Sequence, residues 1–322
     1  MEFIGIDIAK RKFDVSWLSG EKVRKSKVFE NTAAGHGELL AWLKKHGMEV
    51  ETTHLGMEAT SQYYEALAHS LFDAGYTVSV INPLQIKAFG ESKLRRQKTD
   101  KADAELIARF CAQNKPTSWQ APPKEVRELQ RLLARVEALQ DMLVQEQNRR
   151  YEAQGIALES VERILTNLNE EKRRLEKMIE DHIDRHPGLR ARDELLQSIP
   201  GVGPTVSSYV LAWLRPERFD DARQAVAFVG LSPSHHESGD SVRVKSRLSK
   251  LGHGRLRKIL YFPAMSAMRC NLAAQALTER LRLTGKPGKL IVAAIMRKMI
   301  HWMMGVLKSG TPFNASLALA KG

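Results

Sequence analysis

The 322-residue chain has only two cysteines, Cys111 and Cys270, which lie far apart in the sequence. Two isolated cysteines argue against a disulfide-stapled fold and against a zinc site built from cysteine pairs, and they are typical of a reducing cytoplasm. His235 and His236 are adjacent, but no cysteine or histidine stands at a zinc-ligand spacing from them. We therefore expect them to lie in a loop or to contact substrate.

The chain also lacks a long uninterrupted apolar run. Residues 290–307 are the most apolar late stretch, but Arg297 and Lys298 interrupt them. The first apolar stretch, residues 3–8, contains Asp7 and lacks a small-residue cleavage site, which argues against a signal peptide. We therefore expect a cytoplasmic protein with no membrane partner.

Acidic residues are outnumbered, because 37 Asp and Glu stand against 50 Lys and Arg, for a formal net charge of +13. Such an excess attracts polyanions and gains free energy when their counterions are released. At 43% hydrophobic and 27% charged residues, the chain is apolar enough to bury the cores of two or three domains. Nucleic acid is therefore the leading class of partner.

Residues 1–124 alternate strand and helix patterns. Short apolar runs predict three antiparallel strands at the start, with a turn at Ser19-Gly20. The pattern then predicts, in order, a helix at 37–45, a strand ending near Glu58, a helix at 62–74, and a strand at 76–81 that stops at Asn82-Pro83. The order β-β-β-α-β-α-β indicates an α/β domain of ribonuclease H type.

Residues 125–189 carry apolar side chains at gaps of three and four, as at Leu129, Leu132 and Val136, with a break near Gly155. This pattern predicts two long helices that form either a hairpin or a dimerising coiled coil. Such apolar stripes are more typical of packing than of catalysis, and the charged residues are expected on a solvated face.

Residues 190–322 are predicted to be mainly helical. Near their start, residues 199–203 read Ile-Pro-Gly-Val-Gly between two apolar helical segments. This sequence resembles a helix-hairpin-helix element, in which Gly201 and Gly203 let a nucleic-acid backbone approach and helix N-termini donate N–H groups to phosphate. A Pro-Gly turn between two packed helices is the alternative.

Four carboxylates of the first domain have a spacing that suits a metal-dependent nuclease: Asp7, Glu58, Asp100 and Asp103. Asp7 lies on the first predicted strand, Glu58 ends a later one, and the two remaining aspartates share one face of a helix that begins near Thr99. Carboxylates are ligands that Mg²⁺ prefers, and two such ions about 4 Å apart can orient an attacking group and stabilise the leaving oxygen. Singly, Asp100 is more typical of a helix cap and Glu58 of a surface charge, but as a set they predict a magnesium site.

Residues 5–9, Gly-Ile-Asp-Ile-Ala, also resemble the first phosphate-binding element of actin-like ATPases and sugar kinases. Those proteins need a second glycine-containing phosphate loop and a glycine-rich adenosine segment. Neither occurs at the expected place in this sequence, so phosphodiester chemistry is the favoured interpretation.

A second chemical candidate lies in residues 230–250, where serines stand among basic side chains. A serine hydroxyl becomes a useful nucleophile when a base, a metal or dense positive charge stabilises its alkoxide. From spacing alone, Ser238 before a glycine is more typical of a turn, and Ser241 is an equal alternative. The residues predicted to bind phosphate are Arg243, Lys245, Arg247, Lys250, Arg255, Arg257 and Lys258.

Several motifs, in order along nearly the whole chain, resemble the insertion-sequence transposases of the IS110 family. They are Gly5-Ile-Asp-Ile-Ala-Lys10, Glu58-Ala-Thr60, Val80-Ile-Asn-Pro83, Lys98-Thr-Asp-Lys-Ala-Asp103, Ser198-Ile-Pro-Gly-Val-Gly203, Phe228-Val-Gly-Leu-Ser-Pro233 and Glu237-Ser-Gly239. The resemblance implies a bridge-RNA-guided DNA recombinase with a RuvC-like domain at 1–124, a coiled coil at 125–189 and a transposase domain at 190–322.

The resemblance also implies roles for particular residues and partners. Asp7, Glu58, Asp100 and Asp103 become a magnesium-binding tetrad, and Ser238 becomes the nucleophile that joins a 5′ phosphate. A homodimer or homotetramer that holds donor and target DNA together with a bridge RNA is expected. The alternatives are a RuvC-like Holliday-junction resolvase that uses metal-activated water, and a non-catalytic DNA-binding protein.

Overall fold

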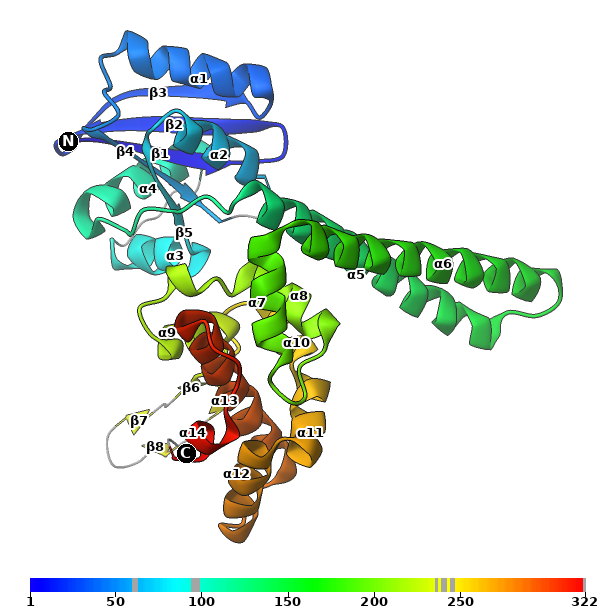
Figure 1. Cartoon of the computed structure of the whole chain (residues 1–322). Coiled ribbons are helices and arrows are strands. Elements are labelled where there is room, and N and C mark those ends of the chain that lie inside the picture. The colour runs from blue at the N-terminus through cyan, green and yellow to red at the C-terminus, as the bar shows by residue number, and fades with distance from the viewer. Residues whose placement is uncertain (60–62, 94–98, 235–236, 239–241, 244–246, 321–322) are drawn as a thin grey trace. The chain divides into compact units, whose positions relative to one another are not determined.

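The computed structural model describes residues 1–59, 63–93, 99–234, 237–238, 242–243 and 247–320 (Figure 1). The chain divides into two compact units, Met1–Ala121 and Pro122–Gly322, which we call unit 1 and unit 2. Apolar residues are buried in cores that belong to one unit or the other, so each unit is described by itself.

The described residues of unit 1 form a five-stranded mixed sheet in the order β3-β2-β1-β4-β5. The first three strands are an antiparallel meander, and β4 and β5 extend it parallel to β1. The predicted β-β-β-α-β-α-β order is confirmed. The elements are β1 (Glu2–Ile8), β2 (Lys12–Ser19), β3 (Lys22–Glu30), α1 (Ala33–Lys45), β4 (Thr53–Glu58), α2 (Glu65–Asp73), β5 (Thr77–Ile81), α3 (Pro83–Ser92) and α4 (Asp100–Asn114).

Two helices begin at capping residues, at positions that the apolar pattern does not predict. The first helix begins at Ala33, four residues early, since Thr32 Oγ1 accepts a hydrogen bond of 3.2 Å from the backbone N–H of Gly35. Asn82-Pro83 does end β5, but it also starts α3, a helix that the pattern did not predict. Asn82 Oδ1 accepts from Leu84 N at 2.9 Å, and Pro83 occupies the first helical position that proline favours.

The helices of unit 1 cover both faces of the sheet. Leu39 and Leu43 of α1 and Leu67 of α2 pack with Ile4 and Ile6 on one face. On the other face, Ile107 and Phe110 of α4 and Ile86 of α3 pack with Phe3 and Leu18. The sheet is therefore enclosed between two helical layers, and α4 is the helix that carries the predicted aspartates.

Two glycines let α4 lie directly on the sheet. A Cβ atom at Gly5 of β1 would stand 1.9 Å from the carbonyl oxygen of Ala104 in α4, and one at Gly56 of β4 would stand 2.2 Å from Cys111 Sγ. Distances this short leave no room for any side chain at either position. The N-terminal half of α4 is thus held against β1 by backbone contact.

The substitution Gly5→Ala is expected to lower the free energy of unfolding of unit 1 by about 1–3 kcal/mol, because the added methyl group must push α4 off the sheet. Gly37→Ala is the matched control, since Gly37 is exposed within α1 and a Cβ there meets nothing within 4 Å. Relief of glycine's helix penalty should make the control more stable by about 0.5–1 kcal/mol. Urea unfolding followed by circular dichroism measures both changes, and equal stability of the two variants would contradict the close approach of α4.

Unit 2 begins with a helical hairpin, formed by α5 (Lys124–Glu152) and α6 (Ile156–Arg185). The two helices run antiparallel and are joined across their faces by polar contacts: Lys172 Nζ donates to Gln140 Oε1 at 2.9 Å, and Arg150 pairs with Glu162 at 3.0 Å. Of the two predicted arrangements, a hairpin within one chain is present, and a dimerising coiled coil stays a prediction.

The base of the hairpin shares a hydrophobic core with the helices that follow it. Leu129 and Leu133 of α5 and Ile179 and Ile183 of α6 are buried in this core. The later elements are α7 (Pro187–Gln197), α8 (Pro204–Trp213), η1 (Pro216–Arg218), α9 (Ala222–Val229), α10 (Gly254–Ile259), α11 (Tyr261–Cys270), α12 (Leu272–Leu283), α13 (Gly288–Ser309) and α14 (Ala315–Ala320). The predicted boundary at residue 189 therefore falls inside one continuous core.

Within the described residues, α13 is the one helix long and apolar enough to cross a membrane by length and composition. Ile295, Met299, Ile300 and Met303 of this helix are fully buried in the core of unit 2. Packing inside the protein therefore accounts for its apolar sequence.

Candidate active site

Three carboxylates lie on the sheet face that α4 covers. Asp7 is two residues beyond Gly5 on β1 and Glu58 is two beyond Gly56 on β4, so both side chains point to the same face as those glycines. Asp14 of β2 stands directly opposite Asp7 in the antiparallel register and shares its face. Three neighbouring strands thus each place one carboxylate on this face, near the same end of the sheet.

The first turn of α4 brings Asp100 and Asp103 to the same end of the sheet. Thr99 caps this helix, since its Oγ1 accepts from Ala102 N at 3.3 Å, as the sequence predicts. Acidic residues in the first turn are favoured by the positive end of the helix dipole. The packing of Ala104 on Gly5 holds this turn beside β1, so all four predicted carboxylates lie in unit 1 at one end of the sheet.

Burial and the neighbouring carboxylates raise the pKa of Asp7. Its pKa is raised from an ordinary 3.8 to about 6, first because burial disfavours the charged form and then because of the charges of Asp103, Asp100, Glu58 and Asp14. Electrostatic coupling to all the other members of the predicted tetrad means that they share one local environment.

A lysine partly neutralises this cluster. Lys12 Nζ donates to Asp100 Oδ2 at 2.8 Å and to Asp14 Oδ2 at 3.2 Å. These bonds raise the pKa of Lys12, and the Lys12 contact holds the pKa of Asp100 below its ordinary value. Lys12 therefore supplies a positive charge between two carboxylates, the kind of position that a metal cation also favours.

The oxygen atoms of these carboxylates are ligands that a divalent metal prefers, although the side chains stand too far apart to enclose one ion by themselves. Among the described residues, no three Asp, Glu, His or Cys side chains are close enough to enclose one ion. Magnesium is usually held by only one or two carboxylates, with water and substrate phosphates as the other ligands. Asp7, Glu58, Asp100 and Asp103 therefore suit a site that nucleic acid completes.

Asp14 is a member of the cluster that the sequence pattern did not single out. It is only 8% exposed, and Lys12 is bonded to it. The signal was present, because residues 8–13 form a tight connection that brings Asp14 opposite Asp7, and Asp14 lies between the buried Phe13 and Val15. A polar residue whose neighbours are both core residues on a strand faces the other side of the sheet.

The raised pKa of Asp7 makes the stability of the metal-free protein depend on pH. The folded state holds the proton of Asp7 more tightly than the unfolded chain does. The protonated Asp7 therefore adds to the free energy of unfolding, fully below pH 3.8, and this contribution is lost as pH rises through about 6. Asp7→Asn removes the charge and should stabilise the metal-free protein near neutral pH by about 1–2 kcal/mol, after discounting for solvent screening of a half-buried group.

Urea unfolding in the presence of a chelator, at about pH 4 and pH 7.5, measures this effect. Asp73→Asn at the exposed end of α2 is the control and should change neither value appreciably. An Asp7→Asn protein that is no more stable than wild type near neutral pH would show that neither burial nor the neighbouring carboxylates disfavour the charge of Asp7.

The predicted helix-hairpin-helix segment consists of α7 and α8 joined by residues 198–203. Gly201 has a φ of +101°, and a Cβ there would stand 2.9 Å from Ala267 Cβ of α11. Gly203 precedes α8, and a Cβ there meets nothing within 4 Å. Packing on α11 thus explains Gly201, whereas the open space at Gly203 is compatible with the approach of a nucleic-acid backbone, and binding by either glycine stays a prediction.

The predicted phosphate-binding residues differ in their surroundings. Arg257 Nη1 donates to the Val229 carbonyl oxygen at 2.9 Å, which ties α10 to the end of α9, and Arg255 pairs with Glu137 of α5 at 2.7 Å. Lys250, with a φ of +55°, and Lys258 are exposed. Arg257 and Arg255 therefore have structural partners, while Lys250 and Lys258 are open to solvent.

The serine segment is described only in part. The backbone of Ser238 lies in β7 (Glu237–Ser238), which pairs with β8 (Val242–Arg243), and β6 (Pro233–Ser234) pairs with β9 (Arg247–Leu248). Ser241, Lys245, His235 and His236 lie outside the described residues. The two short ladders place Ser238 and Arg243 on adjoining strands of one hairpin in unit 2.

Comparison with known proteins gives a consistent family assignment. A transposase model for DEDD proteins of the IS110 type matches residues 4–153, and the model of the transposase IS116/IS110/IS902 family matches residues 193–279. The match at the start covers all four predicted carboxylates, and the match at the end covers Ser238.

Curated relatives are similar over nearly their whole length. The pilin gene-inverting proteins of Moraxella bovis and Moraxella lacunata are each 33% identical over 315 residues, which covers 97% of this chain and 97% of theirs. The probable family 20 transposase of Pseudomonas aeruginosa is 26% identical over 351 residues and covers 97% of this chain and 98% of its own.

Among solved structures, RuvC of Thermus thermophilus is 15% identical, and the match covers 37% of this chain and 99% of RuvC with a TM-score of 0.29. That likeness is too weak to support a conclusion. The two family models and the relatives matched from end to end show that this chain belongs to the IS110 family of transposases.

Proposed function

We propose that this transposase is a DNA recombinase that cuts and rejoins strands by transesterification, with the carboxylate cluster of unit 1 and Ser238 of unit 2 as its two chemical centres. The observation that carries the proposal is the convergence of Asp7, Glu58, Asp100 and Asp103 from three elements, with mutual electrostatic coupling at Asp7. An acidic cluster inside a chain of net charge +13 is suited to phosphodiester chemistry.

The four carboxylates are proposed to hold Mg²⁺. When bound, the ion supplies Lewis-acid stabilisation of charge on phosphate oxygens and helps to orient the reacting strand. The carboxylates provide hard oxygen ligands, and the backbone contact of α4 with Gly5 keeps the ligands of the helix beside those of the sheet. Lys12 pairs with both Asp14 and Asp100, and its positive charge offsets repulsion among the aspartates.

Ser238 is proposed to act as the nucleophile. Its Oγ attacks a DNA phosphorus, an Oγ–P bond forms, the P–O3′ bond breaks, and the proton that leaves Ser238 is balanced by the proton that the released 3′ oxygen gains. The 3′-hydroxyl of another strand then attacks the phosphorus of the phosphoserine, the O3′–P bond forms, the Oγ–P bond breaks, and the proton lost by the 3′-hydroxyl is balanced by the proton that Ser238 Oγ regains. The number of phosphodiester bonds is conserved, so strand exchange consumes neither water nor ATP.

Donor and target DNA, a bridge RNA, and a homodimer or homotetramer are the proposed partners. The Moraxella relatives are named for gene inversion, which is itself a cutting and rejoining of DNA, and this supports recombination by the present chain. Serine and carboxylates lie in separate units, so their cooperation can occur within one chain or between two. If RNA supplies sequence recognition by base pairing, the protein needs mainly phosphate contacts, which its basic composition provides.

The experiment that tests the proposal begins with the nucleic acid that accompanies the protein. We expect protein purified from cells that carry its insertion element to retain one RNA species, and we expect the protein with this RNA and Mg²⁺ to recombine donor and target duplexes. Sequencing of the RNA and of the junctions measures both outcomes. A protein that retains no specific RNA, yet recombines DNA, would contradict guidance by RNA but not the proposed transesterification.

A further inference from the structure

The start of α5 carries a short row of cations, Lys124, Arg127 and Arg131, which we call the basic face. Residues three and four apart on a helix lie above one another, with their Cβ atoms about 5–6 Å apart, so these side chains follow one another along one face. The next cation in the row is Arg135, near Glu171 of α6: the pKa of Glu171 is lowered mainly by a hydrogen bond from Arg174 and in smaller part by the charges of Arg174 and Arg135. The basic face therefore ends at Arg131.

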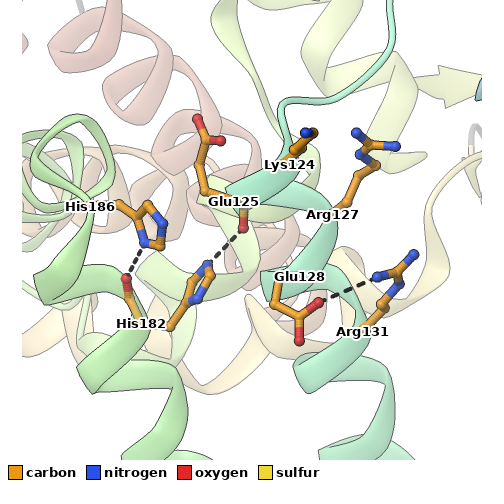
Figure 2. A pocket seen from close by; sticks show the side chains of 7 residues that line it. All are labelled: Lys124, Glu125, Arg127, Glu128, Arg131, His182 and His186. Carbon is orange, nitrogen blue, oxygen red and sulfur yellow. Dashed lines mark hydrogen bonds and ion pairs between the residues drawn. The ribbon is translucent and has the colours of Figure 1, made fainter. Parts of the chain in front are cut away.

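The basic face borders a cavity of about 440 Å³ at the base of the helical hairpin. In Figure 2, Arg127 and Arg131 extend from the same side of α5, and His182 and His186, at the end of α6, lie on the other side of α5. The lining is completed by Lys124, Glu125 and Glu128. Phe, Tyr and Trp are missing from this lining, so the cavity offers charge and hydrogen bonds rather than surfaces for stacked bases.

The hydrogen bonds of this cavity leave its cations available. Glu128 pairs with Arg131 at 3.3 Å, but a guanidinium has five N–H donors and one such contact leaves others for a second anion. Within the part of the chain that the structure describes, Lys124 and Arg127 form no ion pair with a carboxylate. Two cations of the row are thus uncompensated by direct contact, and the third is compensated in part.

The histidines of the cavity are oriented by backbone carbonyls. His182 Nε2 donates to the Glu125 carbonyl oxygen at 2.8 Å, and His186 Nδ1 donates to the His182 carbonyl oxygen at 2.7 Å (Figure 2). The first of these bonds ties the end of α6 to the start of α5. It therefore anchors the helical turn that carries Lys124 and Arg127 to the end of α6.

The backbone at the start of α5 adds to the positive field. Pro123 is the N-cap residue, and no side chain accepts a hydrogen bond from the first turn. The free N–H groups of a helix of 29 residues, together with its dipole, favour an anion at this end. Side chains and backbone therefore favour the same kind of ligand.

We propose that the basic face and its cavity bind the sugar-phosphate backbone of a nucleic acid. The site is distinct from the contacts predicted between residues 201 and 258, and it lies on the hairpin, for which packing alone was expected. Its spacing matches a ligand with successive negative charges along a line, and the lack of stacking surfaces favours a contact that is independent of base sequence. The backbone of duplex DNA and that of a folded RNA share this chemistry.

Neutralisation of the three cations together tests the proposal: Lys124→Gln with Arg127→Gln and Arg131→Gln in the full chain. Binding to a short DNA duplex and, separately, to a folded RNA is measured by fluorescence anisotropy over a range of salt concentrations, with a chelator present so that no catalysis is needed. For the nucleic acid that uses the site, affinity should fall about 10-fold or more at low salt, and the slope of log affinity against log salt should shrink by about 2–3.

The control has the same change of charge elsewhere on the hairpin: Arg163→Gln with Arg173→Gln and Lys177→Gln, three exposed residues of α6. A second variant, Lys124→Arg with Arg127→Lys and Arg131→Lys, keeps the charge and should keep both affinity and slope. Loss with duplex alone identifies DNA as the ligand, and loss with RNA alone identifies RNA. If the triple Gln variant binds both DNA and RNA as wild type does, or if the control loses as much affinity, the basic face is not a nucleic-acid site. Either result would leave the proposed recombinase activity unaffected.

Discussion

Replacement of Asp7 by alanine is expected to reduce strand exchange by on the order of 10³-fold or more, while binding of DNA persists. The pKa of Asp7 is raised by burial and by the charges of four neighbouring carboxylates, and Asp7 lies between Asp14 and Glu58 on adjacent strands. The loss of a central ligand removes stabilisation of charge on the reacting phosphate. The recombination assay with purified donor and target duplexes measures this loss.

Loss of folding is not expected to account for the result. Removal of the Asp7 charge relieves first the cost of burying it and then its repulsion by the other carboxylates, so the metal-free variant should stay folded. Asp103→Ala should show the same loss of strand exchange, and Asp73→Ala, on the exposed end of α2, should retain full activity. Strand exchange that survives in both Asp7→Ala and Asp103→Ala would favour a non-catalytic DNA-binding protein.

The sequence could predict where the four carboxylates lie because that information is local. Alternation along β1 places Asp7 on one face, Glu58 ends β4, and the Thr99 cap fixes the start of the helix that carries Asp100 and Asp103. Parallel strands bring their carboxyl ends to one edge of a sheet, so these positions converge once the strand order is known. Each step needs only periodicity or capping chemistry.

Other features depend on contacts between distant segments. Lys12 bonds to Asp100, 88 residues away, and no local pattern distinguishes it from Lys10 or Arg11. Gly201 resembles a phosphate-contact glycine in sequence, but its surroundings include Ala267 of α11. Arg257 belongs to a basic run, yet it holds the carbonyl oxygen of Val229. Composition predicts the charge of such residues but not their partners.

Replacement of Ser238 by alanine is expected to abolish both the covalent protein–DNA adduct and strand exchange, with a loss on the order of 10⁴-fold or more. Without the Oγ atom no phosphoserine can form, whereas the carboxylate cluster and the phosphate contacts remain. Incubation with radiolabelled DNA and Mg²⁺, followed by denaturing electrophoresis, measures the adduct. Ser234→Ala, on β6, the strand that precedes β7 in the sequence, is the control and should retain the adduct.

The outcomes separate the serine mechanism from its alternatives. An adduct that persists in Ser238→Ala but is lost in Ser241→Ala would identify Ser241 as the nucleophile and would still support the serine mechanism. A wild-type protein that cleaves DNA with Mg²⁺, forms no adduct, and is unaffected by Ser238→Ala would be a junction resolvase in which water is the nucleophile. If the serine mechanism holds, Asp7→Ala should also lower the amount of adduct, because the carboxylate cluster and Ser238 then act on the same phosphate, and unit 1 alone should be unable to form it.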